Sequence, residues 1–330
     1  MKRILLLMVV ACMLLTGCGK NSQKDVLKEF NKKFEKSSGY KVEGNLSINN
    51  NDEVYNYDVE VCYKKDDYYK VTLTNTSNSH TQVILKNDDG VYVLTPSLNK
   101  SFRFQSDWPY NNSQIYLIDA ILNDIKNDEE KSFSKKNNEF IFQTKVNYPN
   151  NSKLIKQKIV LDDNLKLKKV TVYDKNGIDA MTMEFEKINY SPKFKDSDFQ
   201  IDSIMKVEEE GVLKETSSLE DVIYPLFVPS GTKLVNEEKV SKENGERVIM
   251  SYDGEKSFLL VEETADVFNE FTIIPTLGEP YQLMDTLGVM TENSLSWSSG
   301  GIEFYLVSDV MSQDEMVEVA QSITGIVSMK

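Results

Sequence analysis

The sequence predicts a mainly β protein in two parts: an N-terminal unclosed antiparallel β-barrel with helices covering its mouth, and a small α+β C-terminal domain. Apolar and polar residues alternate along many short segments of the first part, as in strands with one buried face. Asparagine is concentrated there, with 23 residues in 1–204 and 4 in 205–330. Charge divides at the same place: residues 1–204 carry 30 basic and 28 acidic groups, whereas residues 205–330 carry 8 and 24, a net charge of −16.

The chain begins with an export signal. Lys2 and Arg3 precede the apolar run Ile4–Leu15, whose length of about twelve residues suits a secretory signal but not a membrane span. The run ends in a motif that resembles a bacterial lipobox: Leu15, Thr16, Gly17 and Cys18. An ordinary secretory signal with a chance cysteine is the alternative. We therefore expect a lipoprotein signal peptide over 1–17, lipid attachment at Cys18, and a lipid-anchored protein on the extracytoplasmic face of the cytoplasmic membrane.

Residues 25–204 are predicted to form the barrel domain. A helix is expected over Gln23–Lys36, where apolar residues recur at helical spacing, and a second over about Ile115–Lys126. Strands are expected at ten segments: Tyr40–Ile48, Val54–Tyr63, Tyr69–Leu73, Val83–Leu85, Val91–Leu94, Phe102–Phe104, Glu139–Val146, Lys153–Leu161, Leu165–Tyr173 and Ile178–Ile188. Their apolar faces must be buried together, so a sheet that curls under the two helices would leave a concave apolar interior.

Aromatic residues mark the candidate ligand- or partner-binding surface. Tyr55, Tyr57 and Tyr63 share one strand face, and we expect them in the concave interior or its core rather than on an outer stripe. Trp108 and Tyr110 flank a proline that stiffens the approach to the second helix. They either line the barrel mouth or dock a partner; alternatively, Trp108 fills the core beneath the helix.

Three runs within this part carry a family resemblance: Val91-Tyr92-Val93-Leu94-Thr95-Pro96, Asn99-Lys100-Ser101-Phe102 and Gln105-Ser106-Asp107-Trp108-Pro109-Tyr110. They resemble the LolA-type lipoprotein-sorting family, most closely its YdcC- and GerS-like sporulation and germination lipoproteins of Gram-positive bacteria, over residues 25–203. The resemblance implies a LolA/LolB-like unclosed barrel with helices closing its mouth, and acyl-chain binding in the barrel cavity. This chain differs from the LolA-type carriers because it is itself expected to be acylated and has an additional domain.

The second part follows a predicted linker over 205–218, which includes Glu208-Glu209-Glu210-Gly211. Residues 219–330 are expected to form an acidic α+β domain. A strand follows the turn at Pro229-Ser230-Gly231-Thr232, and hairpins are expected around Asp253-Gly254 and Ser298–Gly301. Ser312 and Glu315 form a capping box that opens a last helix. This part resembles a small α+β module of Gram-positive membrane-attached proteins, for which no activity is implied.

The residues that usually carry chemistry point away from catalysis. His80 lies in a polar loop and is expected to be solvent-exposed, and Cys62 lies beside Glu60, which disfavours a reactive thiolate. Three aspartate pairs, Asp66-Asp67, Asp88-Asp89 and Asp162-Asp163, lack the regular ligand spacing of a calcium loop and are interpreted as turns. We therefore predict no enzymatic activity, catalytic residue, metal or cofactor. The whole-chain net charge of −14 also argues against nucleic-acid binding.

Two functional hypotheses follow. The first is an anchored interaction or scaffold protein whose partner is a cell-wall or spore-cortex enzyme. The alternative is a binding protein that holds an acyl chain or another apolar envelope ligand in the half-barrel. The anchor and tether are expected over 18–24. The stretch from Cys18 to Gln23 spans at most roughly 20 Å, so the neutral domain is expected near the lipid and the acidic domain farther from its anionic headgroups.

Overall fold

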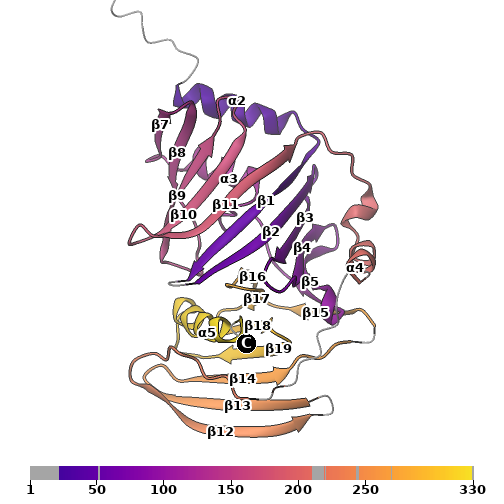
Figure 1. Ribbon diagram of the computed structural model, residues 1–330, viewed down its shortest axis with the longest axis vertical. Coiled ribbons are helices and arrows are strands. Elements are labelled where there is room, and N and C mark those ends of the chain that lie inside the picture. Colours follow the sequence, from indigo (N-terminus) through magenta and orange to yellow (C-terminus); the bar gives the residue numbers. More distant parts are fainter. Residues whose placement is uncertain are drawn as a thin grey trace, which may run out of the picture.

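The computed structural model describes residues 22–50, 53–209, 219, 221–242, 245–268 and 270–328. The predicted signal peptide over 1–17, its lipobox residues, the anchor Cys18 and residues 210–218 of the predicted linker lie outside this range. Two sheets, of twelve and seven strands, form most of the described chain and lie one above the other in Figure 1.

The first sheet is built mainly from the first part of the chain. Its strands are β1 (Gly39–Asn50), β2 (Glu53–Lys64), β3 (Tyr68–Asn75), β4 (Thr81–Asn87), β5 (Gly90–Thr95), β6 (Lys100–Phe104), β7 (Ser132–Lys136), β8 (Glu139–Lys145), β9 (Leu154–Leu161), β10 (Leu167–Asp174), β11 (Asp179–Asn189) and β15 (Thr272–Thr276). The order is β15-β6-β5-β4-β3-β2-β1-β11-β10-β9-β8-β7. β7 and β15 form its two edges, so the sheet is not closed into a barrel, which confirms the predicted fold class.

The concave side of this sheet buries the predicted apolar faces. Along β2 the buried residues Tyr55, Tyr57 and Val59 alternate with exposed polar ones, because successive side chains of a strand point to opposite faces. Two helices pack into the same core: α2 (Gln23–Glu35) and α3 (Ile118–Asn127). In Figure 1, α2 lies across the end of the sheet that is farthest from the second sheet.

The second helix is shorter than predicted. It begins at Ile118 rather than Ile115, because Leu117 has an extended backbone and serves as its N-cap. Ile115, Tyr116 and Leu117 are nevertheless all buried. The spacing of apolar residues alone does not distinguish a buried, non-helical segment before a helix from the first turn of that helix.

The convex side of β2 to β5 is also covered, which the sequence did not indicate. Two short helical segments lie there, η2 (Asp196–Phe199) and α4 (Ile201–Glu209). Phe199, Ile204 and Met205 form a second buried cluster with Cys62 and neighbouring convex-side residues. The predicted linker over 205–218 therefore starts within a packed helix, since Met205 belongs to α4 and to this cluster.

The second sheet belongs entirely to the second part of the chain. Its strands are β12 (Thr232–Lys242), β13 (Gly245–Gly254), β14 (Phe258–Thr264), β16 (Glu279–Gln282), β17 (Leu287–Met290), β18 (Ser294–Ser299) and β19 (Ile302–Val307). The order is β12-β13-β14-β19-β18-β17-β16, and helix α5 (Gln313–Ser328) packs its buried Met316, Val319 and Ala320 into the same core. Both predicted hairpins form, as β13–β14 and β18–β19.

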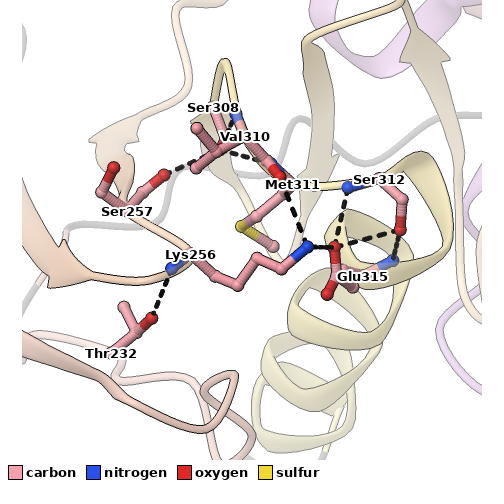
Figure 2. A network of polar contacts seen from close by, with 8 residues as sticks. All are labelled: Thr232, Lys256, Ser257, Ser308, Val310, Met311, Ser312 and Glu315. Atoms are coloured by element: carbon pink, nitrogen blue, oxygen red, sulfur yellow. Dashed lines mark hydrogen bonds and ion pairs between the residues drawn. The ribbon is translucent and has the colours of Figure 1, made fainter.

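The predicted capping box of the last helix is confirmed. The backbone N–H of Ser312 donates to Glu315 Oε2 at 2.8 Å, and the backbone N–H of Glu315 donates to Ser312 Oγ at 3.3 Å (Figure 2). Lys256 Nζ donates to the same Glu315 oxygen at 2.9 Å. Ser308 Oγ also donates to the carbonyl of Ser257 at 2.7 Å, so the start of α5 is fastened to the β13–β14 turn.

Candidate functional site

A cavity of about 930 Å³ lies between the half-barrel (β1 to β11 with α2 and α3) and the second domain (219–328). Its apolar lining includes Leu46, Ile48, Ile84, Trp108, Ile115, Met181, Tyr281, Met284 and Leu287. This volume falls in the range of about 300–1,000 Å³ that is usual for ligand pockets. Asparagines 49, 112, 151 and 176 also line the cavity, so its wall is partly polar.

The loop between β16 and β17 closes the inner part of the concave face. Tyr57 donates its hydroxyl to the carbonyl of Met284 at 2.7 Å. Gln82 Oε1 accepts from the backbone N–H of Leu287 at 2.6 Å and from Thr286 Oγ1 at 3.0 Å. Met284, Leu287 and Val289 belong to the same buried cluster as Tyr57. The second domain therefore supplies part of the core of the half-barrel.

The mouth of the cavity combines exposed apolar side chains with a polar strap. Val54, Ile178 and Phe227 line the cavity and are 56%, 62% and 39% exposed. The strap joins the β8–β9 loop to α5: Lys153 forms an ion pair with Glu318, and the backbone N–H of Ser152 donates to Asp314 Oδ1 at 3.0 Å. These contacts lie at the protein surface.

The five aromatic candidates occupy different environments. Tyr55, Tyr57 and Trp108 are buried, Tyr63 is half-buried, and Tyr110 is 54% exposed. Trp108 lines the cavity, and Tyr57 holds the loop described above. Tyr63 packs between Tyr40 and Tyr69 with tilted rings, the centroids being 5.0 Å and 4.8 Å apart, and Tyr110 donates to Asp67 outside the cavity. Tyr55, Tyr57 and Trp108 thus share one buried core, whereas Tyr63 packs at the margin of that core and Tyr110 lies outside it.

A buried carboxyl group in the first turn of α3 was not anticipated from the sequence. Asp119 Oδ1 accepts from the Tyr40 hydroxyl at 2.7 Å, and Oδ2 accepts from the Tyr69 hydroxyl at 2.9 Å. Burial raises the pKa of Asp119, although the two tyrosine hydrogen bonds oppose this shift. The signal in the sequence was an aspartate within the apolar run of the predicted helix.

The remaining candidates for chemistry lie apart from the cavity. Cys62 is buried, with its pKa raised to about 12 by burial and by the nearby Glu60, so its thiol stays protonated. His80 is half-buried at the β3–β4 turn rather than solvent-exposed, because the loop folds back: its backbone N–H donates to Asn78 Oδ1 at 2.9 Å. The three aspartate pairs lie at turns between strands. Within the described part of the chain, no group of three or more His, Cys, Asp and Glu could hold a metal ion.

Comparison with known proteins identifies the family. The chain is 36% identical to the sporulation protein YdcC of Bacillus subtilis (strain 168) over 325 residues, which cover 98% of this chain and 96% of the relative. The chain belongs to the YdcC family of sporulation proteins. This confirms the resemblance to YdcC-like proteins that the sequence motifs indicated. No family model matches the chain.

Solved structures similar to this YdcC-family chain share little sequence with it. The MucA/MucB complex of Pseudomonas aeruginosa is 12% identical, with a TM-score of 0.33, and covers 92% of this chain and 97% of its own. A LolA superfamily protein from Nitrosomonas europaea is 13% identical, with a TM-score of 0.32, over 55% and 99%. The GerS lipoprotein complex with the CwlD amidase of Clostridioides difficile is 16% identical, with a TM-score of 0.23, over 55% and 100%.

No helix in the described part of this YdcC-family chain is both long enough and apolar enough to cross a bilayer.

Proposed function

We propose that this protein is a non-enzymatic, lipid-anchored lipoprotein of the bacterial envelope that serves as an interaction or scaffold protein for a spore-wall or other envelope factor. The observation that carries this proposal is the closure of the inner part of the half-barrel by its own second domain. Met284 and Leu287 enter the concave core. Tyr57 donates to the carbonyl of Met284, and Gln82 accepts from the backbone N–H of Leu287. A carrier would need that face to be open to its cargo.

The placement of the helices supports the anchored arrangement. The tether before Gln23 is short, and α2 lies at the end of the molecule opposite the second sheet (Figure 1). With Cys18 acylated, the half-barrel would lie near the lipid surface and the acidic second domain would extend away from it, where anionic headgroups repel it least. Acylation at Cys18 and this orientation are part of the proposal.

The cavity supports a second candidate function, the binding of an acyl chain or another apolar envelope ligand. Its volume of about 930 Å³ and its apolar wall suit such a molecule. The exposed Val54, Ile178 and Phe227 at its mouth would then contact the entering ligand.

Native mass spectrometry separates the two functions. The anchored chain would be extracted in mild detergent from sporulating cells and examined for bound lipid, beyond its own anchor, and for bound protein. Ala180 lines the cavity, and Ala180→Trp should occupy part of its volume. This variant should leave a protein complex intact under the scaffold proposal, and it should remove a bound lipid under the alternative. Ile155→Trp, at an exposed position of β9, is the matched control. A stoichiometric lipid with no protein partner would contradict the scaffold proposal.

A further inference from the structure

The central strands of the second sheet are apolar on both faces. One face packs against α5, whereas the first domain reaches the opposite face at one end, through the Lys100–Glu303 ion pair. On β14, Phe258 and Leu260 point into the core shared with α5, whereas Leu259 and Val261 point to the opposite face. On β19, Phe304 and Leu306 point into that core, whereas Tyr305 and Val307 point away from it. A strand with apolar residues on both faces is typical of a sheet that is covered on both sides.

The outward apolar residues are adjacent to one another. Strand register places Ile249 opposite Val261 and Val261 opposite Tyr305, and it places Leu259 opposite Val307. We call these five residues the outer patch. Leu259 and Val307 are 37% and 40% exposed, and the other three are half-exposed. Single exposed apolar residues are common, but a contiguous group across three neighbouring strands marks an interaction surface.

The rim of the outer patch is acidic. Glu238 lies opposite Ile249 on β12, and Asp253, Glu255 and Asp309 are exposed at the end of the sheet where the β13–β14 turn and the residues after β19 meet. The nearby Lys256 is engaged by Glu315, and Arg247 by Glu263. Lys233, opposite Asp253, compensates for part of this charge.

We infer that the outer patch is the docking surface for a partner protein whose contact face has an apolar centre and a margin of lysine and arginine. This inference rests on the proposed scaffold function and adds the place and chemistry of the contact. Charge complementarity supports a basic partner. A second copy of this chain would bring another −16 charges of residues 205–330 to the same surface, which opposes self-association.

Photo-crosslinking in sporulating cells tests the inference. Benzoylphenylalanine would replace Leu259 or Val307 in the full-length anchored chain. Ile178 at the cavity mouth would be a second test position, and Ile155, which is 42% exposed on β9, the matched control. We expect a discrete adduct with one other protein from positions 259 and 307, through a peptide rich in lysine or arginine, and no such adduct from position 155.

Variants show whether this adduct depends on the patch. With the crosslinker at Ile249, Leu259→Ser combined with Val307→Ser should lower the adduct yield at least tenfold. Glu255→Lys with Asp309→Lys should lower it at least threefold. Both pairs change exposed side chains, so the midpoint of thermal unfolding of the purified chain should stay unchanged. If the serine pair lowers that midpoint, the lysine pair alone decides the test.

The other outcomes overturn the inference in distinguishable ways. An adduct with a second copy, an adduct that both variant pairs leave intact, or no adduct at 259 and 307 would reject the outer patch as the docking surface. A protein adduct from Ile178 alone would reject the patch and retain the proposed scaffold function. The absence of protein adducts at every position would reject both.

Discussion

Lys100 Nζ lies 2.7 Å from Glu303 Oε1, and the two side chains are 7% and 8% exposed. The lysine begins β6 of the first sheet and the glutamate lies in β19 of the second, so this ion pair joins the two domains inside the protein. The Tyr305 hydroxyl also donates to Glu303, at 2.6 Å. Directly opposite Glu303 in the β14–β19 register lies Glu263, which is itself buried.

Removal of the lysine should destabilise the protein strongly. In Lys100→Ala, Glu303 would stay buried beside Glu263 without its cation, and breaking a buried pair in this way costs about 3–5 kcal/mol. We expect the free energy of unfolding, measured by urea denaturation, to fall by that amount.

Two matched variants show whether the buried charge is the cause. Lys169 lies 3.0 Å from Glu184 in an exposed pair, and Lys169→Ala should cost below about 1 kcal/mol. Lys100→Met combined with Glu303→Leu should recover most of the lost stability, because no unpaired charge remains buried. Equal losses from Lys100→Ala and Lys169→Ala would contradict this account.

Stability should depend on pH through Asp124. Burial raises the pKa of this carboxyl to about 6, and hydrogen bonds from Ser113 and Gln157 only partly oppose the shift. Because the pKa in the folded state exceeds the unfolded value of about 3.9, the stability it contributes is fully present below pH 4 and is lost as the pH rises through 6. Asp124→Asn should therefore stabilise the protein by about 2 kcal/mol at pH 7 relative to its effect at pH 4. Parallel stability profiles of the two proteins over this range would refute the prediction.

The cap of α5 should contribute measurably to the stability of the second domain. Ser312→Ala removes the hydroxyl that accepts from the Glu315 backbone N–H, and it should cost about 1 kcal/mol of unfolding free energy. Ser322→Ala, inside the same helix, removes only a bond to the nearby Val319 carbonyl and should cost less than about 0.5 kcal/mol. Thermal denaturation of the three proteins makes the comparison; an equal effect of both changes would argue against the cap.

Lipid attachment is testable at a single residue. Cys18→Ser should abolish incorporation of radiolabelled palmitate and release the protein from the membrane fraction. Cys62→Ala is the control and should leave the label in place, because Cys62 is buried in the folded domain. Palmitate label that persists in Cys18→Ser would disprove the predicted anchor.

The elements of the first sheet could largely be predicted because their alternation reports a single buried face. β7 was missed because Phe133 is the single apolar residue among its five, and most of this edge strand is exposed. β12 was not anticipated beyond its first residues for a related reason: nearly all of it is exposed, so no burial pattern marks it. Both strands form because a neighbouring strand supplies backbone hydrogen bonds. Such bonds do not depend on the side chains, so the hydropathy of the sequence does not indicate them.

The candidate site was only partly predictable. The alternation placed Tyr57 on the concave face, and the approach to α3 identified Trp108, which lines the cavity. No local pattern indicated that Met284 and Leu287, more than two hundred residues after Tyr57, would complete the same core. Side-chain periodicity describes which face is buried but not which distant segment covers it.

Strand β15 comes late in the sequence but completes the edge of the first sheet, so that edge can form only late in synthesis. Residues Thr272–Thr276 are the only described neighbours of β6 on its outer side, and they pair with it in parallel. During synthesis, β6 therefore presents unpaired backbone groups until most of the chain has emerged. Such a non-local pairing forms slowly, and an open strand edge in the meantime invites pairing with other chains. A chain that stalls before residue 272 would leave this edge open permanently, so the half-barrel should depend on chaperones until its last strand arrives.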